Sequence, residues 1–180
     1  MIKGVLIAMA LTIGAASAAD AQINTTPAEK LVLETSKGNV VIALRPDLAP
    51  KHVEQIKTLA KKGFYDGVIF HRVIEGFMAQ TGDPTGTGTS GSDLPDIKAE
   101  FTETPYVRGT VGMARTNNPN SANSQFFITF GDAGFLNGQY TVWGQVVEGM
   151  DVVDKINKGE PPRSPDKIIK ATVEEAAAAK

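Results

Sequence analysis

Short apolar runs, separated by loops rich in glycine, proline, asparagine and aspartate, constrain the fold of this chain more than any other feature of its sequence. From residue 68 onward, these runs lie at 68–74, 76–80, 109–113, 125–130, 141–147 and 168–173. Turn-forming residues at both ends of a short apolar run are typical of β-strands. Many short strands with few helices favour a β-sandwich or a closed β-barrel.

The region before residue 68 predicts a hairpin and one long helix. Residues 31–35 and 40–44 form two apolar runs joined by a turn at 36–39. Pro50 suits the first turn of a helix, and Gly63 suits its end. Between them the apolar residues recur at helical spacing, at Val53, Ile56, Leu59 and Ala60. The opposite face is polar, and it carries Lys51, Glu54, Gln55 and Lys57.

Two smaller expectations concern the helices. His52 is expected to be a solvated residue on the surface of the long helix. A second, short helix is expected at 150–157, where three apolar side chains face a core: Val152, Val153 and Ile156.

The N-terminus reads as an export signal. Lys3 precedes an apolar run at residues 5–13, and small residues in the pattern of a cleavage site follow. We expect cleavage after Ala18 or Ala21. The signal peptide then covers residues 1–21, followed by a polar leader at 22–29, one domain at 30–173 and a frayed tail at 174–180. The apolar run is too short to span roughly 30 Å of hydrocarbon, so no membrane anchor is expected.

Composition excludes several classes of function. The chain has no cysteine, which removes disulfides, thiolate metal sites and a cysteine nucleophile. Only two histidines are present, and the net charge is −2, with lysine and arginine scattered along the chain. A nucleic-acid or anionic-membrane binder usually carries a basic excess. We therefore expect no metal site, no cofactor and no nucleic-acid partner.

Two motif matches are too weak to support a function. Residues 86–91 fit the pattern G-x-G-x-x-G, but the stretch after them (92–95) contains proline and is a poor helix, so no helix N-terminus would meet a pyrophosphate. Residues 88–92 fail the G-x-S-x-G pattern of a hydrolase nucleophile at the last position.

One stretch has an unusual mixture of residues. Arg72 lies among apolar residues of a predicted strand, and Phe77, Met78 and Gln80 follow it. A later stretch, 123–128, again mixes amides with aromatic residues. A guanidinium inside an apolar strand needs partners if it is buried. An apolar pocket with one fixed cation and a few amides is a credible ligand site.

The order of several motifs resembles the cyclophilin family of peptidyl-prolyl cis-trans isomerases. The run 70–83 is similar to the family signature, and matching sequences stand at 65–67, 112–114, 123–128, 135–138 and 142–144. The resemblance covers residues 31–173. It implies a mainly β fold, a closed eight-stranded antiparallel β-barrel capped by two α-helices.

The resemblance also implies roles for individual residues. Arg72 matches the catalytic arginine, and Gln80 matches the glutamine that binds substrate backbone. The wall of the proline pocket is matched by Phe77, Met78, Phe127 and Leu136. Further substrate contacts match Ala114, Arg115, Gln125, Phe135 and Tyr140. His71 is interpreted as structural support for its neighbour rather than as a proton shuttle.

Three departures from the common eukaryotic pattern resemble the exported bacterial branch of the family. Phe135 stands in place of tryptophan, Tyr140 stands in place of histidine, and the loop 117–123 is one residue longer. Phenylalanine has no indole N–H to donate, so we expect weak binding of cyclosporin. The expected location is the periplasm, with secretion as the second choice.

The predicted activity is rotation about X-Pro bonds in unfolded or folding exported proteins, which are the expected partners of a monomeric enzyme. Uncatalysed X-Pro isomerisation takes tens to hundreds of seconds, slow enough to limit folding. Two alternatives remain open at this point. The chain could bind proline-containing segments without turning them, or it could be a hydrolase on an unrelated barrel.

Overall fold

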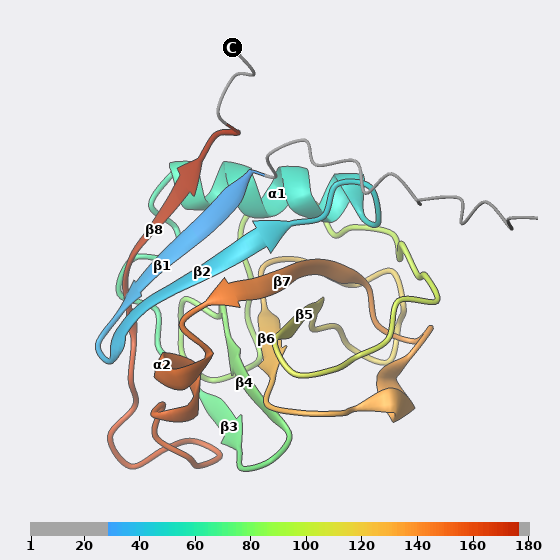
Figure 1. Cartoon of the computed structure of the whole chain (residues 1–180). Helices are drawn as coiled ribbons and strands as arrows, with labels where there is room; N and C mark the ends of the chain where they lie inside the picture. Colours follow the sequence, from blue (N-terminus) through green and yellow to red (C-terminus); the bar gives the residue numbers. More distant parts are fainter. Residues whose placement is uncertain (1–28, 177–180) are drawn as a thin grey trace, which may run out of the picture.

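The structure, a computed structural model, describes residues 29–176 (Figure 1). It contains eight strands, two α-helices and one 3₁₀-helix. The strands are β1 (Lys30–Thr35), β2 (Gly38–Leu44), β3 (Arg72–Ile74), β4 (Met78–Thr81), β5 (Thr110–Met113), β6 (Phe126–Thr129), β7 (Val142–Glu148) and β8 (Ile168–Glu174). The helices are α1 (Pro50–Lys61), η1 (Gly134–Leu136) and α2 (Met150–Asp154).

The predicted hairpin and long helix are confirmed. β1 and β2 pair antiparallel, with Thr35 opposite Gly38 across a two-residue turn. The helix α1 begins at Pro50, and its buried face includes the four predicted apolar residues. Gly63 follows the helix end with a φ of 70°, a left-handed conformation that glycine adopts without steric cost.

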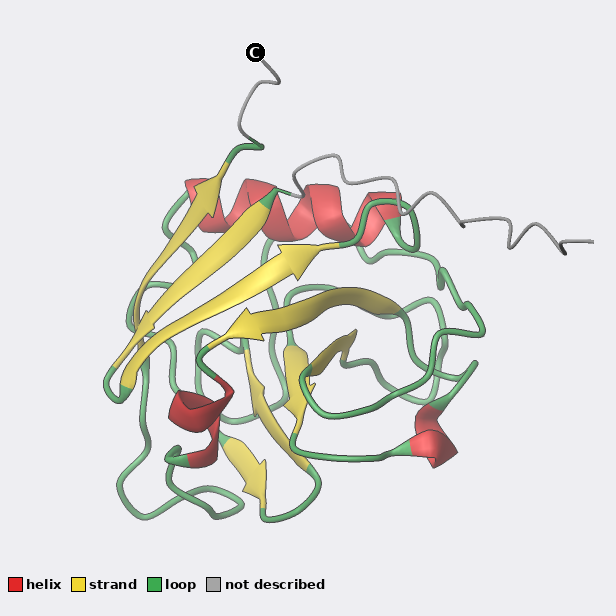
Figure 2. Cartoon of the chain, in the orientation of Figure 1, coloured by secondary structure: helices red, strands yellow, loops and turns green. Residues whose placement is uncertain are grey.

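The eight strands form one antiparallel sheet in the order β3-β4-β6-β5-β7-β2-β1-β8. The sheet curls, with α1 lying along one end of the curl and α2 near the other (Figure 2). The prediction of eight antiparallel strands and two helices is confirmed, but the prediction of a closed barrel is not. The end strands β3 and β8 share no ladder, so the sheet is an open, curled half-barrel.

An irregular segment ahead of β3 explains why the ladder stays open. Residues 67–70 lie beside the start of β8, where Gly67 donates to the Ile168 carbonyl at 2.7 Å and Phe70 donates to the Asp166 carbonyl at 2.8 Å. Only an isolated bridge between Ile69 and Lys167 forms there. The predicted strand at 68–74 is therefore shortened to three residues, β3.

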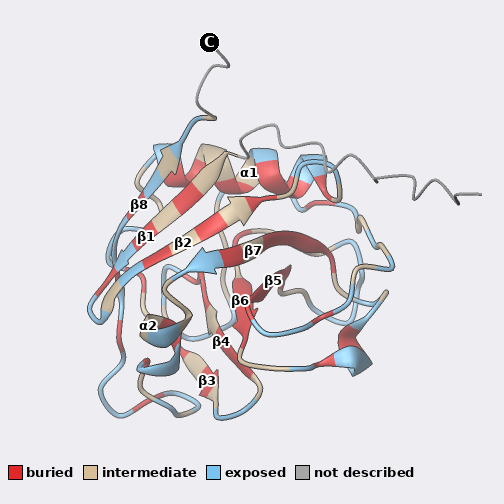
Figure 3. Cartoon of the chain, in the orientation of Figure 1, coloured by how far each residue is buried: buried red, intermediate tan, exposed pale blue. Residues whose placement is uncertain are grey.

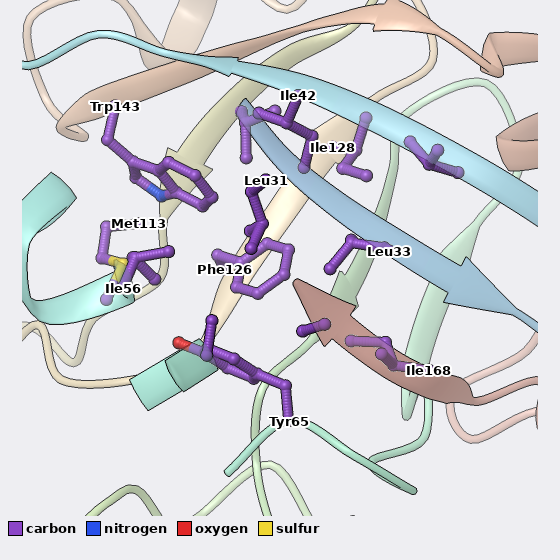
Figure 4. Packing of buried hydrophobic residues seen from close by; sticks show 14 of the residues in the cluster. Leu31, Leu33, Ile42, Ile56, Tyr65, Met113, Phe126, Ile128, Trp143 and Ile168 are labelled. Carbon is purple, nitrogen blue, oxygen red and sulfur yellow. The ribbon is translucent and has the colours of Figure 1, made fainter. Parts of the chain in front are cut away.

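The main core lies inside the curl, where aromatic residues pack edge to face (Figure 4). The Phe126 ring meets Tyr65 at 5.6 Å and Trp143 at 5.3 Å between ring centres, and all three side chains are fully buried. Branched aliphatic residues from β1, β2, β6 and β8 surround them. Strands β5 and β6 are buried along their whole length (Figure 3).

The expectation that His52 is solvated is wrong. The side chain is fully buried, and its Nδ1 lies 2.6 Å from Oε2 of Glu100. Glu100 comes from an irregular segment that covers the start of α1 and also accepts the backbone N–H groups of Lys51 and His52. A carboxylate supplied from 48 residues away along the chain is invisible to helical periodicity.

The predicted short helix is confirmed over its first turn, as α2, with Val153 and Ile156 buried and Val152 half-buried. β8 extends to Glu174, so the predicted tail begins inside a strand. The predicted signal peptide, most of the polar leader and residues 177–180 lie outside the described residues. Within residues 29–176 no helix is long and apolar enough to cross a membrane.

Candidate active site

Strand alternation builds the site on the outer face of the curled sheet. In β6, Phe126 points into the main core and Phe127 points outward into a second apolar cluster. In β3 and β4, Val73 and Ala79 belong to the main core, so their neighbours face the other side. The predicted site residues on these strands therefore share the outer face of the sheet, because successive side chains in a strand point to opposite faces.

Strand register then aligns these residues in one row. Arg72 pairs with Gln80, Gln80 pairs with Phe127, Phe127 pairs with Gly112, and Gly112 pairs with Val142. The row crosses five adjacent strands, from β3 to β7. A guanidinium, an amide and an aromatic ring are thus direct cross-strand neighbours.

Three members of this row, Arg72, Gln80 and Phe127, line a cavity of about 900 Å³ and form its floor. All of the site residues predicted from the sequence line this cavity except Gln125, which lines the cavity next to it. The sequence and the fold therefore bring the whole predicted set together.

One side of the cavity is an apolar wall. Met78, Phe127 and Leu136 are buried and belong to the second apolar cluster, against which Phe77 and Tyr140 pack. Behind the wall, the Tyr106 ring stacks on Phe127 with ring centres 5.7 Å apart. A cavity wall that is itself packed from behind can hold a small apolar ring in one orientation.

Gly112 makes this wall possible. A Cβ atom at residue 112 would lie 2.2 Å from Oη of Tyr106 and 2.7 Å from Cζ of Phe127. Any side chain there would displace both rings.

Phe135 lies at the rim of the cavity. The residue is 66% exposed, and its ring centre lies 5.3 Å from that of Phe77. Phe135 is the second residue of η1, so this short helix holds the aromatic side chain at the rim of the cavity, next to the apolar wall.

Arg72 lies opposite this wall. Its side chain is 43% exposed, and its Nε donates to Oε1 of Glu160 at 2.8 Å. One terminal nitrogen lies 3.5 Å from Oε1 of Gln80. The guanidinium is half-exposed rather than buried, because β3 is short and its outer face opens to the cavity.

Amide groups continue from Arg72 toward a second cavity of about 610 Å³. Gln80 donates to Oε1 of Gln125 at 3.0 Å, and Gln125 donates to the Ser90 carbonyl at 2.8 Å. The two cavities share four lining residues, Gln80, Gly88, Ala114 and Arg115. An extended peptide seated in the first cavity can therefore continue along the sheet into the second.

Arg115 lines both cavities. Its guanidinium lies 4.5 Å from the centre of the Tyr140 ring, within the range of a cation–π interaction. It also donates to the carbonyls of Gln139 and Thr116. The arginine therefore fixes the position of Tyr140 in the cavity wall.

The loop that carries the G-x-G-x-x-G match lines both cavities and is organised by one buried carboxylate. Asp83 accepts hydrogen bonds from the backbone and hydroxyl of Thr85, at 2.7 and 2.8 Å, and from the backbone of Ser90 at 3.1 Å. Burial raises the pKa of Asp83, but these donors outweigh it and lower the pKa to about 2. No helix follows the loop, as the sequence indicated.

His71 lies between this loop and Arg72. Its side chain is buried, and neither ring nitrogen has a hydrogen-bond partner among the described residues. Burial lowers the pKa of His71, with Asp83 opposing and Arg72 adding to the shift. Its role as support for Arg72 stays a prediction.

Sequence reasoning missed six contributors to the main cavity: Gln139, Glu160, Pro161 and the loop residues Gly86, Thr87 and Gly88. Glu160 belongs to a loop that follows α2, 88 residues after Arg72. No spacing in the sequence relates an acidic residue in that loop to an arginine in β3.

Comparison with known proteins places the chain in a family. The family model described as "Cyclophilin type peptidyl-prolyl cis-trans isomerase/CLD" matches residues 30–173. A probable peptidyl-prolyl cis-trans isomerase of Brucella suis is 57% identical over 182 residues, covering 92% of this chain and 91% of the relative. The chain belongs to the cyclophilin family. It is a cyclophilin-type peptidyl-prolyl cis-trans isomerase.

Further relatives of this cyclophilin agree in sequence and in fold. Peptidyl-prolyl cis-trans isomerase-like 1 of Aspergillus fumigatus is 41% identical over 157 residues, covering 82% of this chain and 97% of the relative. A crystal structure of a Hirschia baltica cyclophilin matches with a TM-score of 0.75 and 34% identity, over 81% of this chain and 74% of that one. A Cryptosporidium parvum cyclophilin, crystallised in the presence of the dipeptide Ala-Pro, matches with a TM-score of 0.76 and 30% identity, over 81% and 99% of the two chains.

Proposed function

We propose that this cyclophilin assists the folding of exported proteins by isomerising X-Pro bonds, with Arg72 as its catalytic residue. The observation that carries the proposal is the cross-strand row. It places a permanent cation beside an amide and opposite an apolar wall, in a cavity that opens into a second one. A proline ring and the peptide preceding it need these two kinds of surface.

The reaction needs no bond to be made or broken. Rotation is opposed by amide resonance, with a barrier of about 18–20 kcal/mol. In the twisted transition state the imide nitrogen gains a lone pair, to which a guanidinium N–H of Arg72 donates. Because the planar ground state cannot accept this hydrogen bond, the interaction lowers the barrier rather than only tightening binding.

Arg72 does not supply the whole effect. A rate gain on the order of 10⁵ needs roughly 7 kcal/mol, whereas one charge-assisted hydrogen bond contributes about 1.5–3 kcal/mol. The apolar wall grips the ring and excludes water, and Gln80 holds the carbonyl side while the bond turns. The remaining free energy comes from this enforced twisting and desolvation.

The test is isomerisation of an X-Pro peptide followed by NMR exchange, which needs no coupled protease. Wild type should accelerate exchange, and Arg72→Ala should lose at least about tenfold in kcat/KM, the equivalent of one such hydrogen bond. Arg108→Ala is the matched control, because Arg108 is also a half-exposed, ion-paired arginine and lies outside both cavities. Unchanged kcat/KM in Arg72→Ala would refute the role of Arg72. Retained chaperone action in a variant without isomerase activity would instead favour a binding module.

Export is supported by the signal-like sequence at 1–21 and by the departures Phe135 and Tyr140, which resemble the exported bacterial branch. The proposed location is the periplasm, and the proposed state is a monomer. Expression in a Gram-negative host with cell fractionation tests the location. The full chain should reach the periplasm with Ala19 or Gln22 as its first residue, and a form that begins at Gln22 should stay in the cytoplasm. An unprocessed full chain in the cytoplasm would contradict export.

A further inference from the structure

Glu160 makes the shortest contact with the guanidinium of Arg72. Its Oε1 accepts from Nε at 2.8 Å, whereas the contact of a terminal nitrogen with Gln80 is longer, at 3.5 Å. The carboxylate therefore engages the donor nearest the side-chain stem. The terminal nitrogens carry only the longer contact with Gln80, which leaves them available to a substrate in the cavity.

The backbone of the preceding residue, Gly159, holds Glu160 beside Arg72. Gly159 and Val73 exchange two backbone hydrogen bonds, each 2.8 Å long, so the loop after α2 is fixed beside β3. The other side of the loop is held by Asp166, which accepts the backbone N–H of Asn157 at 2.8 Å. Since Val73 directly follows Arg72, this bridge sets the carboxylate of Glu160 against the guanidinium.

The contact also begins a chain of hydrogen bonds across the cavity floor. Arg72 donates to Glu160 and Gln80, Gln80 donates to Gln125, and Gln125 donates to the carbonyl of Ser90. Each amide in the chain accepts at its oxygen and donates at its nitrogen, so the orientations depend on one another. Within residues 29–176, Glu160 is the one anionic acceptor at the Arg72 end of this chain of hydrogen bonds.

We infer that Glu160 is a positioning residue for Arg72, an inference that rests on the catalytic role proposed above for Arg72. A long side chain on a half-open surface samples several rotamers, and an ion pair at Nε selects the one that keeps a terminal nitrogen beside Gln80 in the cavity lining. The same carboxylate also offsets part of the positive charge. Orientation and charge therefore predict opposite effects of removing it, which makes the inference testable.

The experiment compares Glu160→Ala and Glu160→Gln in the NMR exchange assay. Solvent weakens an ion pair this exposed, so removing it should have a modest effect on the rate. We expect Glu160→Ala to lose about three- to fivefold in kcat with little change in KM. Glu160→Gln keeps an acceptor for Nε and should retain most of the activity. Asp154→Ala is the matched control, since it removes an ion pair of similar exposure with Arg108, away from both cavities. In an Arg72→Ala background, Glu160→Ala should have no further effect.

A spectroscopic readout tests the contact without turnover. The Nε–H signal of Arg72, assigned by its loss in Arg72→Lys, should exchange slowly with water in wild type and faster in Glu160→Ala, and Asp154→Ala should leave it unchanged. A rise in kcat for both Glu160 variants would overturn the inference in favour of simple charge screening. A change in KM alone would also overturn it, by making Glu160 a substrate contact. If wild type itself were inactive, the proposed function would fail first, whereas an active wild type with an unaffected Glu160→Ala overturns this inference alone.

Discussion

Asp83 offers a quantitative test of how the loop at 83–91 is held together. The carboxyl is buried, and donors from Thr85 and Ser90 lower its pKa from the usual 3.8 to about 2. A difference of this size between the unfolded and folded chains contributes about 2.5 kcal/mol to stability when the group is ionised in both. Asp83→Asn keeps the shape of the side chain but removes the charge, so it should destabilise the protein by about that amount at neutral pH.

The pH dependence distinguishes this charge from ordinary packing. Because the folded pKa is the lower one, the contribution is fully present above the unfolded pKa and is lost as the pH falls through about 2. Between about pH 5 and pH 3, the stability gap between wild type and Asp83→Asn should shrink by roughly 1 kcal/mol. Because Asp83 raises the pKa of His71 in the folded chain, the comparison is made with His71→Gln in both proteins, so that titration of this histidine does not contribute to the gap.

Urea unfolding of both proteins at each pH provides the measurement. Carboxylates far from the loop titrate alike in the two proteins and cancel in the difference. A gap that stays constant or widens toward pH 3 would show that the hydrogen bonds of Asp83 do not depend on its charge, and would refute the reasoning.

Three further predictions concern the wall, the core and the rim of the cavity. Gly112→Ala should displace the Phe127 ring, and we expect a lower melting temperature in thermal melts and a loss of at least about tenfold in kcat/KM by NMR exchange. Gly131→Ala is the control, because the space around its Cβ is open, and it should change neither the melting temperature nor kcat/KM. Tyr65→Phe removes a buried hydroxyl that donates to a backbone carbonyl at 3.0 Å, so urea unfolding should show a loss of about 1–3 kcal/mol. Phe135→Trp adds an indole N–H at the rim and should tighten cyclosporin binding in calorimetry, and unchanged affinity would contradict the reading of this position.

Local pattern predicted most of the elements because the forces that form them are local. The helix from Pro50 and the hairpin of β1 and β2 follow from apolar spacing and turn residues. The sequence pattern overestimated the length of the strand predicted at 68–74, because its N-terminal half pairs irregularly with residues near the start of β8 and only β3 remains. Whether a curled sheet closes into a barrel depends on pairings between segments far apart in the sequence, and the periodicity of apolar residues does not predict such pairings.

The candidate site was predictable to the extent that its motifs are contiguous. Arg72, Gln80 and Phe127 were selected from two short stretches, but their alignment in one row depends on strand register. The burial of His52 was predicted wrongly and Glu160 was not predicted at all. The reason is the same, since each has its charged partner on a segment far away in the sequence. Long-range charge pairs leave no local trace in the sequence.

The distant pairings of the sheet also govern how this enzyme acquires its own activity. β1 pairs with β8 near the end of the chain, and the loop carrying Glu160 reaches Arg72 through the bridge between Gly159 and Val73, which lie 86 residues apart in the sequence. Contacts of such long sequence separation form slowly during folding. Recovered isomerase activity should therefore lag behind the appearance of helical signal in refolding, and a nascent chain released before β8 is synthesised should have no catalytic function. An enzyme of this architecture cannot assist its own folding while that folding is incomplete.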